Sequence, residues 1–486
     1  MAYDYDLVVL GSGPAGEKGA AQAAYFKKRV AVIEVAPEPG GACVHTGTLP
    51  SKTLREAALF LSGWADRELY GIHVDVDRAQ ATPRMLSRKE VVRRLEVERI
   101  RWNLDRHQVT SVFGHGRFLD PHRIEVRKPD GSLQSFSTEF ALIATGSEPF
   151  HPSNVPFSDP DVDDSDSILQ IDRLPDRMVV LGAGVIGCEY ACMFAALGVK
   201  VTLVEARDAL LPFLDREVAA ELASAMQELG VELLMSAKYE GVERTEPVIG
   251  GSSPPAGLQS HGSLRTGPRV LSTRLAGGRV LESDKLLYCA GRNGRTGSIG
   301  LENIGVTADK RGAIPVNEHF QTTTPNVYAV GDCIGFPALA SVSMEQGRVA
   351  MVHAFQLGYK QRISPNVPYG LYTIPEVSFV GLTEEEAKQQ GLEAVVGRAF
   401  LKDNTRGKIR GDKRGFVKLV FDKQKKTLLG VHCVGGPAAE LVHIGHAILT
   451  LGGGVDTLID MVFNHPTLAE SYKYAAYDAL GRWGSS

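Results

Sequence analysis

The sequence predicts an α/β fold with two Rossmann-like βαβ units and a C-terminal α+β domain. Residues 5–34 run in the order strand, Gly-rich turn, helix and strand, and residues 177–205 repeat that order. From about residue 366 the chain alternates short strands and then forms an apolar helix. Because 486 residues are too many for a single hydrophobic core, we expect several domains.

The first unit carries the loop GSGPAG directly after the strand YDLVVL. Its Gly11, Gly13 and Gly16 have GxGxxG spacing, which combines a tight turn, close approach of the backbone to a pyrophosphate and close helix–strand packing. Glu34 ends the second strand, where a carboxylate can accept hydrogen bonds from ribose hydroxyls. This unit therefore predicts a dinucleotide site.

The second unit repeats the pattern with Gly182, Gly184 and Gly187, and Glu205 ends its second strand. An acidic Glu205 favours a free 2′-hydroxyl and hence NAD, whereas Arg207 can meet a 2′-phosphate and admit NADP. The pattern leaves the choice between the two nucleotides open. The duplication implies two dinucleotides in one chain.

Composition restricts the class of partner. The chain has 53 basic and 57 acidic residues and no block of like charge, so we expect no nucleic-acid or anionic-membrane partner. Six scattered cysteines without a CxxC pair favour neither a disulfide scaffold nor a metal site, and they fit a reducing cytoplasm. No signal peptide or long apolar run is present, so we expect a soluble, unprocessed protein.

Three further segments are notable. Residues 141–149, ALIATGSEP, predict a buried strand that ends in a turn at Thr145 and Gly146. Asp332 follows another apolar strand and can bond a polyol hydroxyl of a flavin. Residues 247–268 are rich in Gly, Ser and Pro and predict a flexible surface insertion in the second unit.

In chain order, GSGPAG, GGACVHTGTLPSK, ATG, GAGVIGCE, TPNVYAVGD and NHPTLAE resemble the flavoprotein disulfide reductases, the group containing dihydrolipoamide dehydrogenase and glutathione reductase. The resemblance implies that the first loop, with Thr145, Gly146 and Asp332, holds FAD and that the second holds NAD(P). It also implies a homodimer. The implied domains are an FAD-binding domain over 1–150, an NAD(P)-binding domain over 151–290, a central part completing the FAD domain over 291–365 and a dimerisation domain over 366–486.

The family stretch reads GGxCxxxxCxPSK, and its two cysteines form a redox disulfide against the flavin. This chain has Cys43 but carries Thr48 at the second position, and a hydroxyl cannot accept electrons as a disulfide. Cys43, beside the flavin, is then either an exposed thiolate or a small buried residue left from an ancestral pair. Together with DDSDSIL at 163–169, the segment GGACVHTGTLPSK most resembles the soluble pyridine nucleotide transhydrogenases.

The resemblance also implies roles for four other side chains. Lys52 reaches flavin N5 and pairs with Glu189, so that positive charge stabilises electron density arriving on the ring. His465 and Glu470 match the HPTxxE motif that exchanges protons with thiol substrates. Because Thr48 leaves no thiolate to protonate, His465 is either a structural interface residue or a proton donor to another acceptor.

The function predicted from the sequence is FAD-dependent NAD(P) transhydrogenation. In the resembled enzymes hydride passes by ping-pong from NADPH to FAD and from reduced FAD to NAD. One alternative is an NAD(P)H:quinone or dye reductase on the same scaffold, with His465 and Glu470 supplying protons. Another is a non-catalytic flavin redox sensor that uses Cys43.

Overall fold

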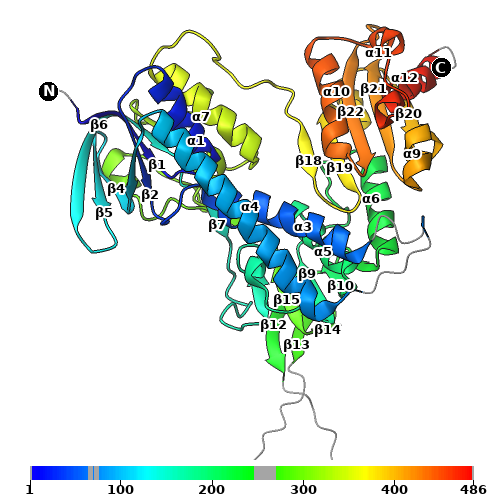
Figure 1. Cartoon of the computed structure of the whole chain (residues 1–486), viewed down its shortest axis with the longest axis horizontal. Coiled ribbons are helices and arrows are strands. Elements are labelled where there is room, and N and C mark those ends of the chain that lie inside the picture. The colour runs from blue at the N-terminus through cyan, green and yellow to red at the C-terminus, as the bar shows by residue number, and fades with distance from the viewer. Residues whose placement is uncertain (1–2, 64–68, 71–75, 246–269, 484–486) are drawn as a thin grey trace, which may run out of the picture. The chain divides into compact units, whose positions relative to one another are not determined.

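The computed structural model describes residues 3–63, 69–70, 76–245 and 270–483, and the insertion predicted at 247–268 lies outside them. The chain forms two compact units, whose elements are drawn in Figure 1. Unit 1 comprises Met1–Ala57, Pro83–Phe150 and Gly291–Val367, and unit 2 comprises Ala58–Thr82, His151–Ala290 and Pro368–Ser486. The four-domain division stays a prediction.

Unit 1 is built on a seven-stranded sheet of order β3-β2-β1-β6-β5-β4, and β17 also pairs with β6. The strands are β1 Tyr5–Leu10, β2 Val30–Glu34, β3 Thr110–Phe113, β4 His115–Asp120, β5 Arg123–Arg127, β6 Leu133–Ile143 and β17 Val327–Ala329. The end of β6 pairs in parallel with β1 and β17, whereas its beginning pairs antiparallel with β5. A separate antiparallel pair joins β7 Ser147–Pro149 to β16 Arg292–Gly294.

Alternate residues of β1 enter different cores, as the period of two in a strand requires. Leu7 and Val9 pack with residues of α1, α4 and α7, whereas Val8 and Leu10 pack with β4 and β5. The helices are α1 Pro14–Tyr25, α2 Gly41–His45, α3 Thr48–Ser62, α4 Arg78–Arg106 and α7 Ala340–Ala354, with the 3₁₀ turns η2 Leu301–Ile304 and η3 Gly331–Ile334. α3 and α4 each include residues of both units.

Helices α1 and α7 lie side by side in Figure 1. A Cβ on Gly347 would lie 2.3 Å from the carbonyl oxygen of Ala15, so the two helices approach at backbone distance. The chain next to the first glycine loop is thereby fixed against α7.

Unit 2 begins with an all-parallel sheet of order β11-β10-β9-β15-β8. Its elements are β8 Val162–Asp164, η1 Ser167–Gln170, β9 Arg177–Leu181, α5 Val185–Ala196, β10 Lys200–Val204, α6 Arg216–Glu228, β11 Val231–Leu234 and β15 Lys285–Tyr288. An antiparallel sheet of β12 Tyr239–Thr245, β13 Val270–Leu275 and β14 Val280–Ser283 follows β11. The second predicted βαβ unit is therefore β9-α5-β10, parallel to its neighbours.

The remaining part of unit 2 is an antiparallel sheet of order β18-β19-β22-β21-β20. Its elements are β18 Tyr369–Leu371, β19 Glu376–Gly381, α8 Glu384–Gln389, β20 Ala394–Phe400, η4 Leu401–Asp403, α9 Thr405–Arg410, β21 Phe416–Asp422, β22 Leu428–Gly435, α10 Ala438–Thr450, α11 Val455–Asp460, η5 Leu468–Glu470 and α12 Ser471–Arg482. One apolar core joins β20–β22 to α10, α11 and α12. Parallel sheets with helical connections and a separate antiparallel α+β part confirm the predicted fold class. None of the described helices combines the length and apolar character needed to cross a bilayer.

Candidate functional site

Two glycines of the first loop are required by the fold itself. Gly11 has φ +101°, and a Cβ there would lie 2.4 Å from the carbonyl oxygen of Ala144. A Cβ on Gly16 would lie 1.9 Å from the carbonyl oxygen of Gly11. These contacts close the turn between β1 and α1 and bring the helix against the strand, as the spacing predicts.

Gly13 differs, because nothing among the described residues prevents a side chain there. It caps α1 with φ −63°, and the nearest atom to a Cβ is the Cα of Gly41 at 3.9 Å. No side chain of the described residues caps this helix end, so its first N–H groups remain available to an anion. The residues present therefore fit the pyrophosphate of the expected FAD.

The Glu34 carboxylate holds this loop in shape. Its Oε2 accepts hydrogen bonds from the Ser12 backbone N–H at 2.8 Å and the Ser12 hydroxyl at 2.6 Å, and its Oε1 accepts from Ala36 N–H at 2.9 Å. The Ser12 hydroxyl in turn accepts from Gly40 N–H at 3.1 Å. Three donors leave one of about four carboxylate lone-pair sites for a ribose hydroxyl. Ser12 is a residue that the glycine pattern alone did not single out.

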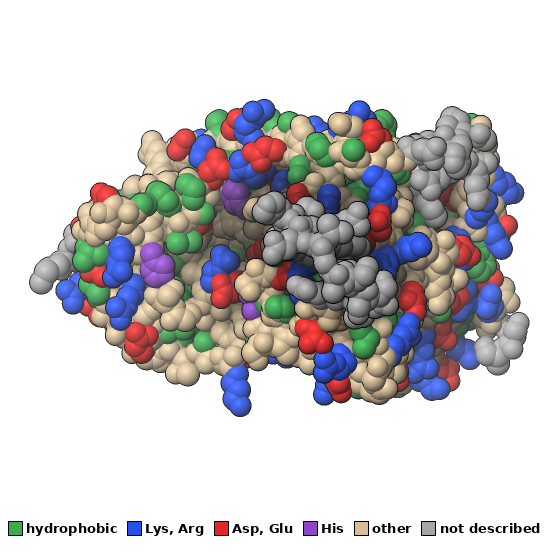
Figure 2. Space-filling model, turned by 90° about the horizontal axis from the view of Figure 1, so that it is seen from below, with side chains coloured by type: hydrophobic (Ala, Val, Ile, Leu, Met, Phe, Trp, Pro, Cys, Tyr) green, Lys and Arg blue, Asp and Glu red, His purple; other side chains and the backbone are tan. Residues whose placement is uncertain are grey.

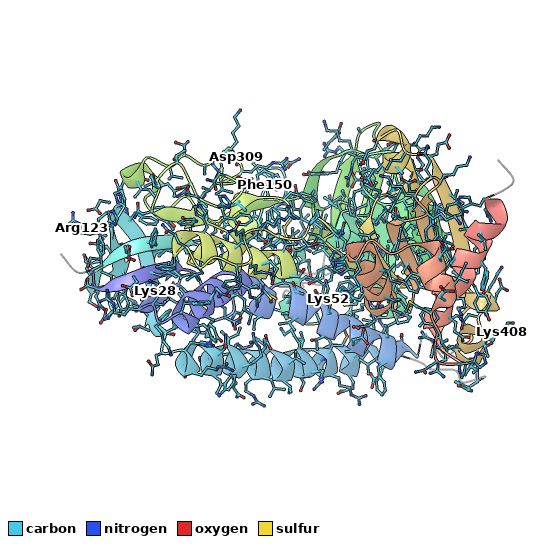
Figure 3. All side chains as sticks on the ribbon, turned by 90° about the horizontal axis from the view of Figure 1, so that it is seen from above. Lys28, Lys52, Arg123, Phe150, Asp309 and Lys408 are labelled. Atoms are coloured by element: carbon cyan, nitrogen blue, oxygen red, sulfur yellow. The ribbon has the colours of Figure 1, made fainter. Side chains whose placement is uncertain are left out.

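Cys43 and Thr48 lie in contact, as the two cysteines of a redox pair would. Cys43 is in α2, Thr48 begins α3, and their side chains are close enough for the Thr48 hydroxyl to act on the thiol. Burial raises the pKa of the Cys43 thiol, the Thr48 hydroxyl acts in the opposite direction, and the charges of Asp332 and Lys52 are also felt at the sulfur. Cys43 is half-buried, so its exposure lies between the two predicted alternatives, and the raised pKa favours a neutral thiol over a thiolate. Figure 3 labels Lys52 on α3.

Asp332 is held by two residues that the sequence did not single out. The Ser147 hydroxyl donates to Asp332 Oδ2 at 2.8 Å, and Arg292 Nε donates to the Ser147 hydroxyl at 3.0 Å. Arg292 Nη2 also donates to the Ser147 carbonyl at 3.0 Å. A serine directly after ATG and an arginine in AGRN were the signals available, but their meeting depends on the pairing of β7 with β16.

The ATG turn contributes a polar atom in need of a partner. The Thr145 hydroxyl oxygen is buried, and within the described residues it has no partner with good hydrogen-bond geometry, although it interacts weakly with the Cys333 thiol. Gly146 has φ +70°, and no heavy atom of its surroundings lies within 4 Å of the position that a Cβ would take. Both features suit a turn that faces a bound group, consistent with the predicted FAD site.

The second loop repeats this division of roles among its glycines. Gly182 has φ +101° and would place a Cβ 3.0 Å from the backbone of Ala290, and a Cβ on Gly187 would lie 1.9 Å from the Gly182 carbonyl oxygen. Gly184 caps α5 with φ −74°, and no heavy atom in the described part of the chain lies within 4 Å of a Cβ there. This open position again fits the close approach of a pyrophosphate.

Glu205 and Arg207 are already joined to each other. Arg207 Nε and Nη2 donate to the two carboxylate oxygens of Glu205 at 3.0 Å and 2.9 Å, and the backbone N–H groups of Arg207 and Ala183 donate at 3.1 Å and 2.9 Å. Burial acts to raise the pKa of Glu205, but these bonds outweigh it and lower the pKa to about 2. The sequence placed both residues at the nucleotide, but not their ion pair.

The other predicted site residues lie in unit 2. Glu189 is buried on α5, and its Oε1 accepts from the backbone N–H of Tyr372 at 2.9 Å. His465 Nδ1 lies 3.0 Å from both carboxylate oxygens of Glu470, and this bond lowers the pKa of Glu470. The His465–Glu470 pair is thus formed within one chain, whereas the Lys52–Glu189 pair stays a prediction.

Surface charge is mixed on the face drawn in Figure 2, where Lys and Arg side chains are interspersed with Asp and Glu. A surface that binds a phosphate backbone needs a stripe of one sign. Among the described residues no group of three or more His, Cys, Asp or Glu side chains is arranged to hold a metal ion.

Comparison with known proteins identifies the family. The family model described as pyridine nucleotide-disulphide oxidoreductase matches residues 5–347, and the dimerisation domain of the same family matches residues 367–476. A soluble pyridine nucleotide transhydrogenase of Mycobacterium tuberculosis is 44% identical over 99% of this chain and 98% of its own. One from Pseudomonas putida is 39% identical over 99% of each chain. A Cu(II) complex of the HOCl-induced flavoprotein disulfide reductase RclA from Escherichia coli superposes with TM-score 0.84 and 28% identity, covering 98% of this chain and 99% of that one.

Proposed function

The chain belongs to the pyridine nucleotide-disulphide oxidoreductase family, and on that premise we propose that it is an FAD-dependent NAD(P) transhydrogenase. The reaction is NADPH + NAD⁺ → NADP⁺ + NADH, in which one hydride moves and no proton is gained or lost. The observation that carries the proposal is its similarity, at 39–44% identity over nearly the full chain, to relatives that bear this name.

The chain's own residues divide the task between the two loops. Gly13, the N-terminus of α1, Glu34 and Asp332 would hold FAD, which when bound supplies two-electron hydride chemistry on its ring. Gly184, Glu205 and Arg207 would hold NADPH and NAD⁺ in turn. Because both nucleotides use one loop, the protein supplies orientation and electrostatics and needs no acid or base for the exchange.

The thiol site supports electron transfer without a disulfide. Thr48 contacts Cys43 but cannot be oxidised to a disulfide with it, so no second redox pair drains electrons from the nucleotides. Lys52 adds positive charge that is felt at Cys43, and such charge stabilises negative charge arriving nearby. The raised pKa of Cys43 argues against a redox sensor, because sensing requires an accessible thiolate.

A quinone or dye reductase is the second candidate, and the His465–Glu470 pair is the observation that favours it. His465 is well exposed and already oriented by the carboxylate at 3.0 Å, as a proton donor to an acceptor would be. Reduction of a quinone by NADPH consumes one proton, because the other hydrogen of the quinol comes from the hydride, whereas nucleotide exchange consumes none.

One experiment separates the two candidates. The purified yellow protein is supplied anaerobically with NADPH and either thio-NAD⁺ or a quinone as sole acceptor. We expect one thio-NADH for each NADPH consumed, with slow or no quinone reduction. Rapid quinone turnover without thio-NADH formation would replace the transhydrogenase by the reductase.

The oligomeric state and the cellular compartment are proposed from less specific observations. The match of residues 367–476 to a dimerisation domain supports a homo-oligomer, and we propose a homodimer. All six cysteines lie within the described residues as reduced thiols, which agrees with a reducing cytoplasm as the compartment.

A further inference from the structure

The Glu205 carboxylate is saturated with hydrogen-bond donors. Four N–H groups reach it at 2.9–3.1 Å, two on each oxygen. A carboxylate offers about four lone-pair sites. In this arrangement Glu205 therefore has no site left for a ribose 2′-hydroxyl, although that hydroxyl is the group by which NAD would be read.

Glu34 provides an internal control, because it holds the same position in the first loop. Each carboxylate accepts one N–H from its glycine loop and one from the residue two positions further on, namely Ser12 and Ala36 for Glu34. Glu34 adds only the Ser12 hydroxyl, whereas Glu205 adds two N–H groups of one guanidinium. The loss of the last acceptor site in the second loop is thus due to the Arg207 side chain.

Hydrogen bonds hold the backbone of both residues, whereas the Arg207 side chain reaches solvent. Ser236 N–H donates to the Arg207 carbonyl at 2.9 Å, and Ala237 N–H donates to the Glu205 carbonyl at 2.8 Å. The Arg207 side chain is 49% exposed, against 9% for Glu205. Two of its five guanidinium N–H groups are used by Glu205, which leaves three for a further anion.

We propose that Arg207 acts as an intramolecular competitor of NAD. A 2′-phosphate binds to the free N–H groups of Arg207 while Glu205 holds the guanidinium from the other side, so NADP(H) binds to the intact pair. The 2′-hydroxyl of NAD(H) reaches Glu205 only after Arg207 has left it. The inference rests on the proposed function in one respect, namely that a single loop serves both nucleotides.

The charges favour this arrangement over a wide range of pH. The pKa of Glu205 lies at about 2 and that of Arg207 is raised by the same bond, so both groups stay charged at neutral pH. Arg207 also neutralises a carboxylate that would otherwise repel a 2′-phosphate. One side chain thus strengthens the binding of one nucleotide and weakens the binding of the other.

The test uses ligands that cannot exchange hydride. ADP-ribose and 2′-phospho-ADP-ribose differ only in the 2′-phosphate, and calorimetric titration of the oxidised flavoprotein gives the Kd of each. For Arg207→Ala we expect 2′-phospho-ADP-ribose to bind about tenfold or more weakly, and ADP-ribose to bind several-fold more tightly, about the size of one released hydrogen bond. Glu205→Ala should weaken both ligands, because it removes the acceptor and the group that holds Arg207.

Arg173→Ala is a matched control, since Arg173 is also half-exposed and pairs with a carboxylate, Asp161, at 2.8 Å. It should leave both Kd values unchanged. Parallel weakening of both ligands in Arg207→Ala protein with an unaltered flavin spectrum and melting temperature would overturn the competition. Opposite shifts in a protein that fails to form thio-NADH would reject transhydrogenation and keep the inference, because fragment binding involves no hydride.

Discussion

Thr48→Cys should restore the redox pair that this chain lacks. The Thr48 hydroxyl is close enough to the Cys43 thiol to lower its pKa. A cysteine at position 48 would carry its sulfur on Cβ, as threonine carries its hydroxyl, and would therefore lie beside Cys43. A disulfide is a two-electron couple and FAD is another. Wild-type protein should therefore take up about two electrons per FAD, and Thr48→Cys protein about four.

Anaerobic titration with NADPH or dithionite measures this uptake directly. The variant should also develop a long-wavelength band from a thiolate lying against oxidised flavin, and hydride exchange should slow as electrons enter the new pair. The double variant Cys43→Ser/Thr48→Cys is the control and should return to two electrons. The reasoning would be refuted if Thr48→Cys protein, after treatment with an oxidant, still showed both cysteines as free thiols and took up only two electrons. Cys43 and the new cysteine would then not be in contact.

Three other outcomes are expected. Gly184→Ala should fold and keep its flavin but bind both nucleotides about five- to hundredfold more weakly, since a methyl group in contact with a pyrophosphate costs roughly 1–3 kcal/mol. Gly187→Ala should not yield folded protein, because its Cβ would lie 1.9 Å from a carbonyl oxygen. His465→Ala should leave thio-NADH formation within about twofold of wild type, a small change on the scale of one hydrogen bond, and its abolition with dimer and flavin intact would contradict an interface role. Burial lowers the pKa of His353, whose Nδ1 lies 2.8 Å from the Tyr328 hydroxyl, so the folded state favours neutral imidazole. Stability from this group is complete above pH 6.5 and falls below it, and His353→Gln should flatten the melting temperature between pH 5 and 7.

The glycine spacing predicted most of the fold near the site, because steric limits on a backbone turn are local. Gly11 and Gly16, and their counterparts in the second loop, adopt the close contacts that GxGxxG requires. The repeat of this unit and the antiparallel C-terminal part also follow from periodicity, which depends on near neighbours in the chain.

Contacts between segments that are distant in the sequence could not be predicted from local patterns. Arg292 reaches Ser147 because β16 pairs with β7, and no local pattern encodes that pairing. The Glu205–Arg207 pair is a different case, because the two residues are only two positions apart. Their types suggested two separate roles, and only the geometry of four donors on one carboxylate shows that those roles compete.

The two loops differ in one further way that bears on how long a nucleotide stays bound. In the first, the chain continues over the loop: Gly40 N–H bonds the Ser12 hydroxyl, and a Cβ on Gly41 would lie 2.9 Å from the Cα of Gly13. In the second, no heavy atom of the described residues lies within 4 Å of a Cβ on Gly184, which is nearly as open as Gly13, whose nearest atom is at 3.9 Å. Enclosure slows dissociation, because surrounding segments must open before a ligand leaves. We therefore expect the first βαβ unit to retain its cofactor and the second to exchange its nucleotides, as alternate binding of two nucleotides requires.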